Sequence, residues 1–285
     1  MIEGRPSETA QRVAAHRLAF ERVATKYGNP AADMALATDV AGWPQHGMSA
    51  GRMHDYLRAR TAFFDRVVVA ALERGFTQVV IGAAGYDGRA LRYAKPGVTW
   101  FEVDLPSTQQ DKLARLRRLE VATGHVRFVE ADFAFDPVAE RLLAAGLNPS
   151  SSCLFLLEGV AVYLERGVLE RALRQFRQAA GPDSLLAISM SIDSDAHDPE
   201  VRSRFREAVA AIGEPARLTL ELAEAVELLA STEWQELAEV HATESSANED
   251  NDEDSEEDGD EAAQQRRRSV GLLLAKAMPG PRPGS

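Results

Sequence analysis

A glycine-rich turn, GAAGYDG, follows the apolar run QVVI (78–81) and precedes a helix-like stretch. Doubly wound α/β sheets hold nucleotide-like ligands at such a turn between a strand and a helix. Gly82, Gly85 and Gly88 are spaced by threes, however, and do not form the GxGxxG pattern that dinucleotide binding prefers. The turn alone therefore predicts either a ligand site or a tight connection between a strand and a helix.

Carboxylates stand at the ends of the next three apolar runs. Asp104 ends FEVD, nineteen residues after Gly85, where a carboxylate can accept hydrogen bonds from the two hydroxyls of a ribose. Asp132 ends VEAD, where it could accept from an adenine amino group, and Glu158 follows LFLL. One acid at a strand end is often a solvated terminus, but three beside a glycine turn favour a ligand rich in donors. S-adenosylmethionine has a ribose, an adenine amine and an ammonium group, whereas NAD would bring a pyrophosphate.

The elements that would position these residues follow a regular alternation. Two helices, over 7–28 and about 49–74 with a loop between them, are predicted to precede any strand. Continuous apolar runs then alternate with helical stretches, as expected for strands covered on both faces. This pattern predicts a doubly wound, Rossmann-like α/β sheet that is mostly parallel with an antiparallel final strand. The predicted strands are 78–82, 98–104, 126–132, 153–159, 184–191, 233–240 and 269–277.

The net charge of −12 is concentrated in one tract. Residues 244–261, ESSANEDNDEDSEEDGDE, hold eleven acids and no base, and removing these eleven charges from −12 leaves −1 for the rest. A nearly neutral remainder gives no electrostatic footprint for nucleic acid or an anionic membrane. The tract has little to bury, so we expect a disordered acidic insert over 244–264. We expect one domain over 1–285, with a helical cap (1–76) and an α/β core (77–243 and 265–285).

Other features of the composition narrow the class of protein. An apolar content of 45% is enough for a sizeable core. The longest apolar run, CLFLLEGVAVYL, is too short to cross a membrane and contains Glu158. The N-terminal residues do not form a signal peptide, and Cys153 is the single cysteine, so an internal disulfide is excluded. These features predict a cytoplasmic protein, with Cys153 in its core.

Several segments together resemble the S-adenosylmethionine-dependent methyltransferases of the leucine carboxyl methyltransferase type, including their bacterial O-methyltransferase branch. They are RPSETAQRVAAHR, RTAFFDR, VVIGAAGYDGRALR, FEVDLPSTQQDK, VEADF and LEGVAVYL, and they span roughly the first two-thirds of the chain. FEVDxP and LEGVxxYL are much more specific than the glycines. The resemblance implies a class I methyltransferase sheet, N-terminal helices over the site, S-adenosyl-L-methionine as cofactor and a small-molecule acceptor.

The resemblance also implies roles for matched residues. Arg60 would pair with the methionine carboxylate, Gly85 would let the backbone approach the cofactor, and Asp104 would bind the ribose. Asp132 and Phe133 would hold the adenine, Glu158 would face the methionine end, and Tyr163 is the best candidate for a substrate contact. The family usually has a GAG core in the turn, so Ala83 or Ala84 here replaces a glycine. Asp87 and Arg89 match the family's D-x-R, although an ion pair at the start of a helix explains them equally well.

The sequence predicts no obligatory catalytic base. A carboxylate acceptor, with a reference pKa near ~4, is ionised at neutral pH, whereas a phenol near ~10 would gain from a base. His46 and His54 flank the loop into the second helix, and His197 lies in SIDSDAHDP. That stretch could supply metal ligands, but loops after strands are commonly rich in Asp and Ser, so no metal is predicted.

Methyl transfer to an oxygen, preferably a carboxylate, of a small molecule is the leading function. A nicotinamide-dependent oxidoreductase is disfavoured by the glycine spacing. A non-catalytic protein that keeps the fold and acts through its acidic tract is supported only by the alanine in the turn.

Overall fold

The computed structural model describes residues 7–42, 52–192, 216–237 and 271–279. Its centre is a seven-stranded sheet in the order β3-β2-β1-β4-β5-β7-β6. The first five strands are parallel, and β7 is antiparallel to both β5 and β6. The strands are β1 (Gln78–Gly82), β2 (Thr99–Asp104), β3 (Val126–Glu130), β4 (Leu154–Leu157), β5 (Leu185–Ser189), β6 (Trp234–Glu236) and β7 (Leu272–Ala277). The predicted sheet is confirmed, with strands somewhat shorter than expected.

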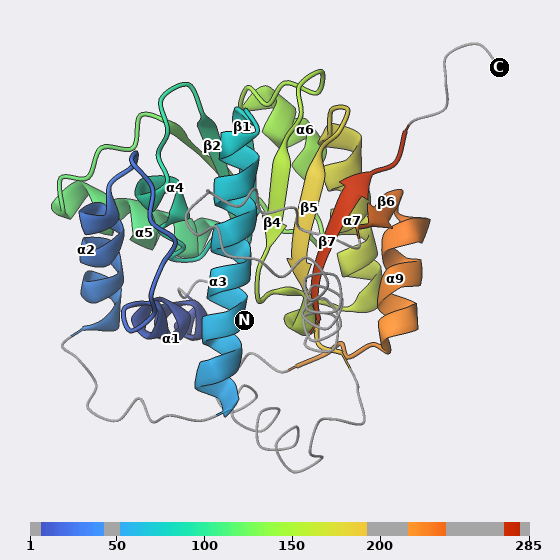
Figure 1. The fold of residues 1–285 in the computed structure, drawn as a ribbon, viewed down its shortest axis with the longest axis horizontal. Helices are drawn as coiled ribbons and strands as arrows, with labels where there is room; N and C mark the ends of the chain where they lie inside the picture. Colours follow the sequence, from blue (N-terminus) through green and yellow to red (C-terminus); the bar gives the residue numbers. More distant parts are fainter. Residues whose placement is uncertain (1–6, 43–51, 193–215, 238–270, 280–285) are drawn as a thin grey trace, which may run out of the picture.

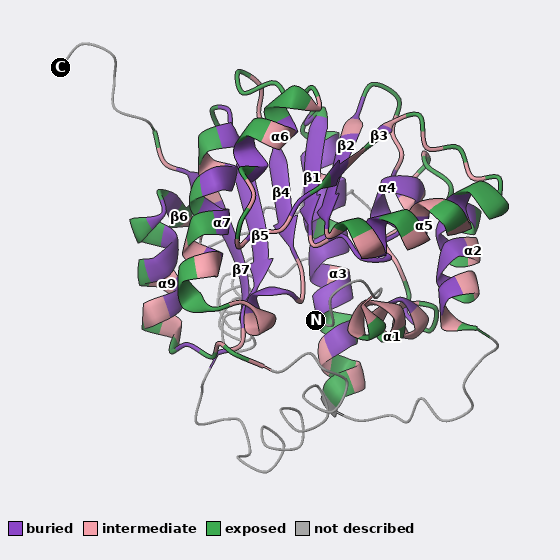
Figure 2. Ribbon diagram, turned by 180° about the vertical axis from the view of Figure 1, so that it is seen from behind, coloured by how far each residue is buried: buried purple, intermediate pink, exposed green. Residues whose placement is uncertain are grey.

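The central strands are buried on both faces because helices cover both sides of the sheet (Figure 2). β1, β4 and β5 are buried along their whole length, as their continuous apolar sequences predict. Along β1, Val79 faces one cluster of core residues and Val80 faces the other. The two faces therefore have separate cores, and only the strand ends reach the edge of the sheet.

The helices form the outer layers of the molecule (Figure 1). They are α1 (Glu8–Arg17), α2 (Pro30–Ala41), α3 (Arg52–Glu73), α4 (Arg89–Arg92), α5 (Pro106–Arg118), α6 (Val138–Ala144), α7 (Arg166–Ala179) and α9 (Leu222–Ser231), with a 3-10 turn η1 (Ala161–Tyr163). The core residues of α3 pack on one face of the sheet, and those of α6, α7 and α9 pack on the other. In the described parts of the chain, no helix is long and apolar enough to cross a membrane.

Two predictions about the N-terminal region are wrong. The expected loop after residue 28 contains α2, which begins with Asn29 as N-cap, since its side chain accepts a hydrogen bond from the N–H of Ala32 at 3.1 Å. Pro30 at the first helical position fits this start, because its missing N–H would have no partner there. The first helix is also shorter than predicted, because it ends at Arg17 and the following residues run as a non-helical segment that carries Arg22.

The described N-terminal segments gather beside the β1 half of the sheet. α1 lies across the edge at which the parallel strands end, while α2 packs on α1 and α4 (Figure 1). The prediction that N-terminal helices cover this edge is confirmed. The acidic tract lies outside the described residues, so its expected disorder and the proposed domain boundaries stay predictions.

Candidate functional site

The turn after β1 has a backbone shape that favours glycine at two positions. Ala83 has a φ of +51° and Gly85 a φ of +49°, both in the left-handed region that side chains other than glycine rarely adopt. Gly82 is needed for another reason, because a Cβ there would lie 2.8 Å from the ring of Phe176. Ala83 therefore occupies the position at which the sequence lacks an expected glycine.

Asp104 lies directly beside this turn, as its place at the end of the adjacent strand predicts. One carboxylate oxygen accepts a hydrogen bond from the N–H of Gly85, and the other accepts one from the N–H of Leu105 at 2.7 Å. The residue is only 8% exposed. These two backbone hydrogen bonds hold the carboxylate in place beside the turn.

Glu158 directly follows β4 and is surrounded by three arginines. Its Oε1 lies 3.0 Å from Nε of Arg60 on α3, and its Oε2 lies 2.9 Å from Arg17 on α1 and 2.5 Å from Arg89. Burial opposes ionisation, but the three guanidiniums outweigh it and hold the pKa of Glu158 well below its usual range. Glu158 is therefore a charged carboxylate at neutral pH. The structure brings Arg60 and Glu158 together in a direct ion pair.

Arg89 connects this pair to the core of the domain. Its side chain is completely buried and forms ion pairs with Asp65 at 2.7 Å and with Asp87 at 2.6 Å. Asp87 also accepts a hydrogen bond from the backbone N–H of Arg89 at 2.8 Å. Burial raises the pKa of Asp87, but Arg17 and Arg89 lower it further, so the net pKa is below its ordinary value. The interpretation of Asp87 and Arg89 as an ion pair at the start of a helix is confirmed.

Arg17 is a site residue that sequence reasoning missed. It contacts Glu158 and lies 3.4 Å from Asp87, although 141 residues separate it from Glu158 in the chain. It is one of several arginines in the N-terminal helical stretch, and nothing in its spacing distinguishes it from Arg12 or Arg22. Only the three-dimensional packing of α1 reveals its role.

α1 also lies directly on the glycine turn. A Cβ at Gly85 would come within 2.9 Å of the Cβ of Ala10, and the N–H of Ser7 donates to Oγ1 of Thr108 on α5 at 3.4 Å. With Arg17 on Glu158, these contacts hold the helix against both β1 and β4 strand ends. A ligand that approaches Gly85 must therefore share this space with α1 or displace it.

Asp132 and Phe133 follow β3 and point in different directions. The Asp132 carboxylate, at the partly exposed rim, accepts a hydrogen bond from the N–H of Ala134 at 2.8 Å. The Phe133 ring is buried in the core, where it meets the Phe176 ring edge-on at 5.8 Å between centroids. Asp132 can therefore reach a ligand with its carboxylate, whereas Phe133 can contribute mainly its backbone. The adenine role of both residues stays a prediction.

Tyr163 and His54 are two further residues that the sequence singles out and the structure describes. Tyr163 ends η1 and is partly exposed, so its role as a substrate contact stays a prediction. His54 on α3 contacts the Phe20 ring edge-on at 5.1 Å and lies 3.8 Å from Asp55. His46, His197 and the run SIDSDAHDP beyond Ile192 lie outside the described residues. Within the described ranges there is no cluster of three or more potential metal ligands.

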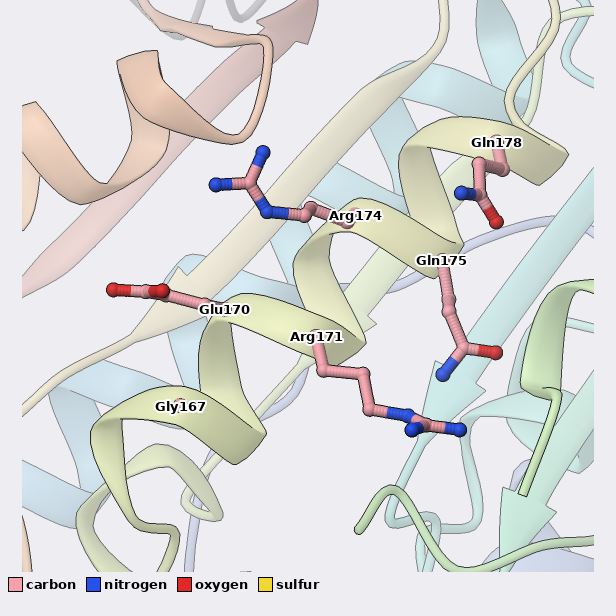
Figure 3. A pocket seen from close by; sticks show the side chains of 6 residues that line it. All are labelled: Gly167, Glu170, Arg171, Arg174, Gln175 and Gln178. Carbon is pink, nitrogen blue, oxygen red and sulfur yellow. The ribbon is translucent and has the colours of Figure 1, made fainter. Parts of the chain in front are cut away.

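An open groove of about 410 Å³ lies elsewhere, on the solvent face of α7 (Figure 3). Its lining arginines, Arg171 and Arg174, extend from the helix in different directions. Arg171 donates to the backbone carbonyl of Phe135 at 3.0 Å, and Arg174 donates to that of Ser231 at 2.9 Å. These side chains tie α7 to the loop after β3 and to the C-terminal end of α9, and none of the predicted site residues lines the groove.

Comparisons with known proteins show what the chain is similar to. Residues 9–177 match the leucine carboxyl methyltransferase family. A protein of Parafrankia sp. (strain EAN1pec), named as an inferred S-adenosyl-L-methionine-dependent methyltransferase, is 40% identical over 144 residues, which are 50% of this chain and 46% of that protein. A similarly named protein of Mycobacterium sp. (strain KMS) is 35% identical over 160 residues, 54% of this chain and 51% of its own length. The chain thus matches about half the length of these curated relatives.

A solved structure shows that the likeness extends to the fold. The crystal structure of an inferred methyltransferase from Thermobifida fusca has a TM-score of 0.57, with 17% identity, and the match covers 98% of this chain and 97% of that one. The family match covers more than half of the chain and includes the glycine turn, Asp104 and Glu158. The chain belongs to the leucine carboxyl methyltransferase family.

Proposed function

We propose that the protein is an S-adenosylmethionine-dependent O-methyltransferase that acts on a small molecule, preferably on a carboxylate. The observation that carries this proposal is the convergence of Gly85, Asp104, Glu158 and Arg60 at one edge of the sheet. In this set, Gly85 would let a ligand approach the backbone closely, and Asp104 offers a carboxylate to hydroxyl groups. Glu158 and Arg60 offer opposite charges to the ammonium and carboxylate groups of an amino acid. Family membership supports the same cofactor.

The residues fit the cofactor in their chemistry. When bound, S-adenosylmethionine supplies an electrophilic methyl group that a substrate oxygen attacks in line with the departing sulfur. Asp104 would accept hydrogen bonds from the ribose hydroxyls, and Asp132 one from the adenine amine. Glu158 would pair with the ammonium group and Arg60 with the carboxylate.

Positioning supplies most of the proposed catalysis. Alignment of a nucleophile with its target can replace a costly bimolecular encounter, and a carboxylate acceptor is already ionised at neutral pH. α1 would exclude water from the reacting groups, since it lies on the glycine turn and pairs with Glu158. Tyr163 would contact the acceptor. No side chain needs to remove a proton from a carboxylate acceptor.

Cofactor identity can be tested by binding. S-adenosylmethionine or S-adenosylhomocysteine should raise the melting temperature, and NAD should not, because a ligand that binds only the native state stabilises it. Asp104→Ala should weaken binding of S-adenosylhomocysteine by about 1.5 to 3 kcal/mol, the value of a hydrogen bond to a charged group. Glu140→Ala, which removes an exposed carboxylate on α6, is the control. Unchanged affinity of the Asp104 variant in calorimetry would remove the ribose assignment, and stabilisation by NAD alone would favour an oxidoreductase.

The acceptor class needs a separate experiment. With a carboxylate acceptor, single His46→Ala, His54→Ala and His197→Ala variants should keep most of their single-turnover rate. With a phenol or alcohol, loss of a positioned base typically costs about 10²- to 10⁴-fold. A collapse of that size in one variant, with cofactor binding preserved, would exclude the carboxylate assignment.

A further inference from the structure

A second small cavity is lined by residues of α1, α2 and α4 and of the segments next to them. Its volume is about 140 Å³, and three arginines line it: Arg17, Arg22 and Arg92. The one carboxylate in its lining is Asp33. The wall of the cavity therefore carries more positive than negative charge.

The three arginines differ in how many of their N–H groups have a hydrogen-bond partner. Arg22 binds Asp65 through Nε at 2.5 Å and through a terminal nitrogen at 3.0 Å, and its other terminal nitrogen lies 3.2 Å from Asp33. Arg92 binds Asp33 only through Nε, at 2.5 Å, so among the described residues its two terminal nitrogens have no hydrogen-bond partner. Nε of Arg17 also lacks a partner in the described part of the chain, but it is shielded from solvent. The terminal nitrogens of Arg92 are therefore the donors that remain for an anion.

The lining arginines belong to a network of ion pairs that is unbalanced by one charge. Within the described ranges, this network joins the cations Arg17, Arg22, Arg60, Arg89 and Arg92 to the anions Asp33, Asp65, Asp87 and Glu158. Five guanidiniums thus share four carboxylates. A bound carboxylate would balance the cluster, and a guanidinium can hold a carboxylate through two parallel hydrogen bonds.

Two exposed apolar side chains line the cavity. Leu18, which directly follows α1, is 40% exposed, and Met34 on α2 is 54% exposed. A ligand that places an anionic group on the arginines would therefore lay an apolar segment on these two side chains. The volume is below the range of roughly 300 to 1,000 Å³ for drug-sized ligands, which limits the occupant to a small molecule or one end of a larger one.

We propose that this cavity binds a small organic carboxylate with an apolar body, using Arg92 as its anion partner. The site is separate from the proposed cofactor site, since Gly85, Asp104 and Arg60 are not among its lining residues. Arg17 contacts both sites. The proposal does not depend on the methyl-transfer activity, and its first tests use no cofactor.

Hexanoate and hexanamide are matched probes, because they have the same shape and differ in charge. Hexanoate should bind the full-length protein in calorimetry at pH 7, about tenfold or more tightly than hexanamide, since a charge-assisted hydrogen bond is roughly twice as strong as a neutral one. Equal affinities, or no binding of hexanoate at millimolar concentration, would overturn the proposal.

Two variants locate the probe. Arg92→Gln should weaken hexanoate binding by about tenfold or more, because it removes the guanidinium fork. If this variant does not fold, Met34→Glu gives the answer, since Met34 is half exposed and its replacement places a negative charge in the lining of the cavity. Met34→Glu should weaken binding by about threefold or more, while Met34→Gln, the uncharged control, should stay within about twofold. Equal affinities of the Glu and Gln variants would place the probe elsewhere and overturn the proposal.

A last measurement separates this cavity from the cofactor site. Hexanoate should still bind when S-adenosylhomocysteine is saturating. If the cofactor product abolishes hexanoate binding completely, the arginines belong to the methionine end of the cofactor site and the proposal is wrong. Failure of S-adenosylhomocysteine itself to bind would instead contradict the proposed function and leave the hexanoate result as it stands.

Discussion

The alanine at position 83 should be a source of strain that a single substitution can relieve. Ala83 and Ala84 are neighbours in the turn after β1, but only Ala83 has a positive φ, at +51°. Ala84 is buried, with 5% of its surface exposed, and Ala83 is half-buried. Replacing each by glycine changes one methyl group and one backbone preference, so the pair is an internally controlled experiment.

The exposure and backbone conformation of the two alanines set the expected changes in the free energy of unfolding. Both substitutions lose about 0.4 to 1 kcal/mol, because glycine makes the unfolded chain more flexible. Ala83→Gly regains about 1 to 2 kcal/mol from the left-handed conformation, less about 0.4 kcal/mol for a half-buried methyl group. Ala84→Gly regains nothing and loses about 0.8 kcal/mol for a buried methyl group. Since the flexibility cost cancels between the variants, Ala83→Gly should be more stable than Ala84→Gly by about 1.5 to 2.5 kcal/mol.

Denaturant unfolding of the two variants and the parent protein measures this difference. Ala83→Gly should lie close to or slightly above the parent in stability, and Ala84→Gly should lie about 1 to 2 kcal/mol below it. A difference of roughly 3 to 10 °C in melting temperature between the variants is expected for a chain of this size. Equal destabilisation of both variants would show that Ala83 is not strained and would refute the reasoning.

Three further predictions follow from the site and the core. Glu158→Gln leaves three guanidiniums around a neutral amide and should cost about 3 to 5 kcal/mol of unfolding free energy near pH 7. Because the pKa of Glu158 is depressed on folding, the carboxylate stabilises the fold above the unfolded pKa of 4.5, and this stabilisation is lost as the pH falls below that value. The variant should therefore lose less stability than the parent in acid titrations followed by circular dichroism. Burial raises the pKa of the Cys153 thiol well above its usual range, and the side chain is fully buried, so a thiol reagent should label it only after unfolding; rapid labelling of the native protein would contradict this. Replacing residues 244–261 by a short Gly-Ser linker should leave the melting temperature and cofactor affinity nearly unchanged, since closure entropy depends only logarithmically on loop length; a large loss would mean that the tract packs on the domain.

The sheet and the strand-end residues were predictable because both follow from local rules. Continuous apolar runs such as QVVIG and LFLL indicate buried parallel strands, and parallel neighbours must end at the same edge. Gly85 and Asp104 therefore had to meet once β1 and β2 were paired. Helix α2 could also have been predicted, because Asn29 and Pro30 form a standard helix start, but the prolines and glycines farther along masked it.

The arginine cluster could not be predicted in the same way. Which of the N-terminal arginines reaches Glu158 depends on where α1 ends and on how it packs across the sheet edge, and neither is encoded in a short motif. Arg17 and Arg22, five residues apart, bind different carboxylates because the helix stops between them. The burial of the Phe133 ring could not be predicted for the same reason, since its contact with Phe176 joins segments far apart in the chain.

The ion pair between Arg60 and Glu158 imposes a condition on any ligand of this site. Breaking a buried pair by removing one partner is costly, because the other charge is left uncompensated. An amino-acid end that carries both an ammonium group and a carboxylate avoids this cost, since insertion between the two side chains gives each a new partner of opposite charge. A ligand with only the carboxylate leaves Glu158 to Arg17 and Arg89. A ligand with only the ammonium group leaves Arg60 without its partner Glu158. We therefore expect S-adenosylhomocysteine to bind at least about tenfold more tightly than its analogue without the amino group, because the analogue loses a charge-assisted contact. Calorimetry measures both affinities. Equal values would show that Glu158 does not receive the ammonium group.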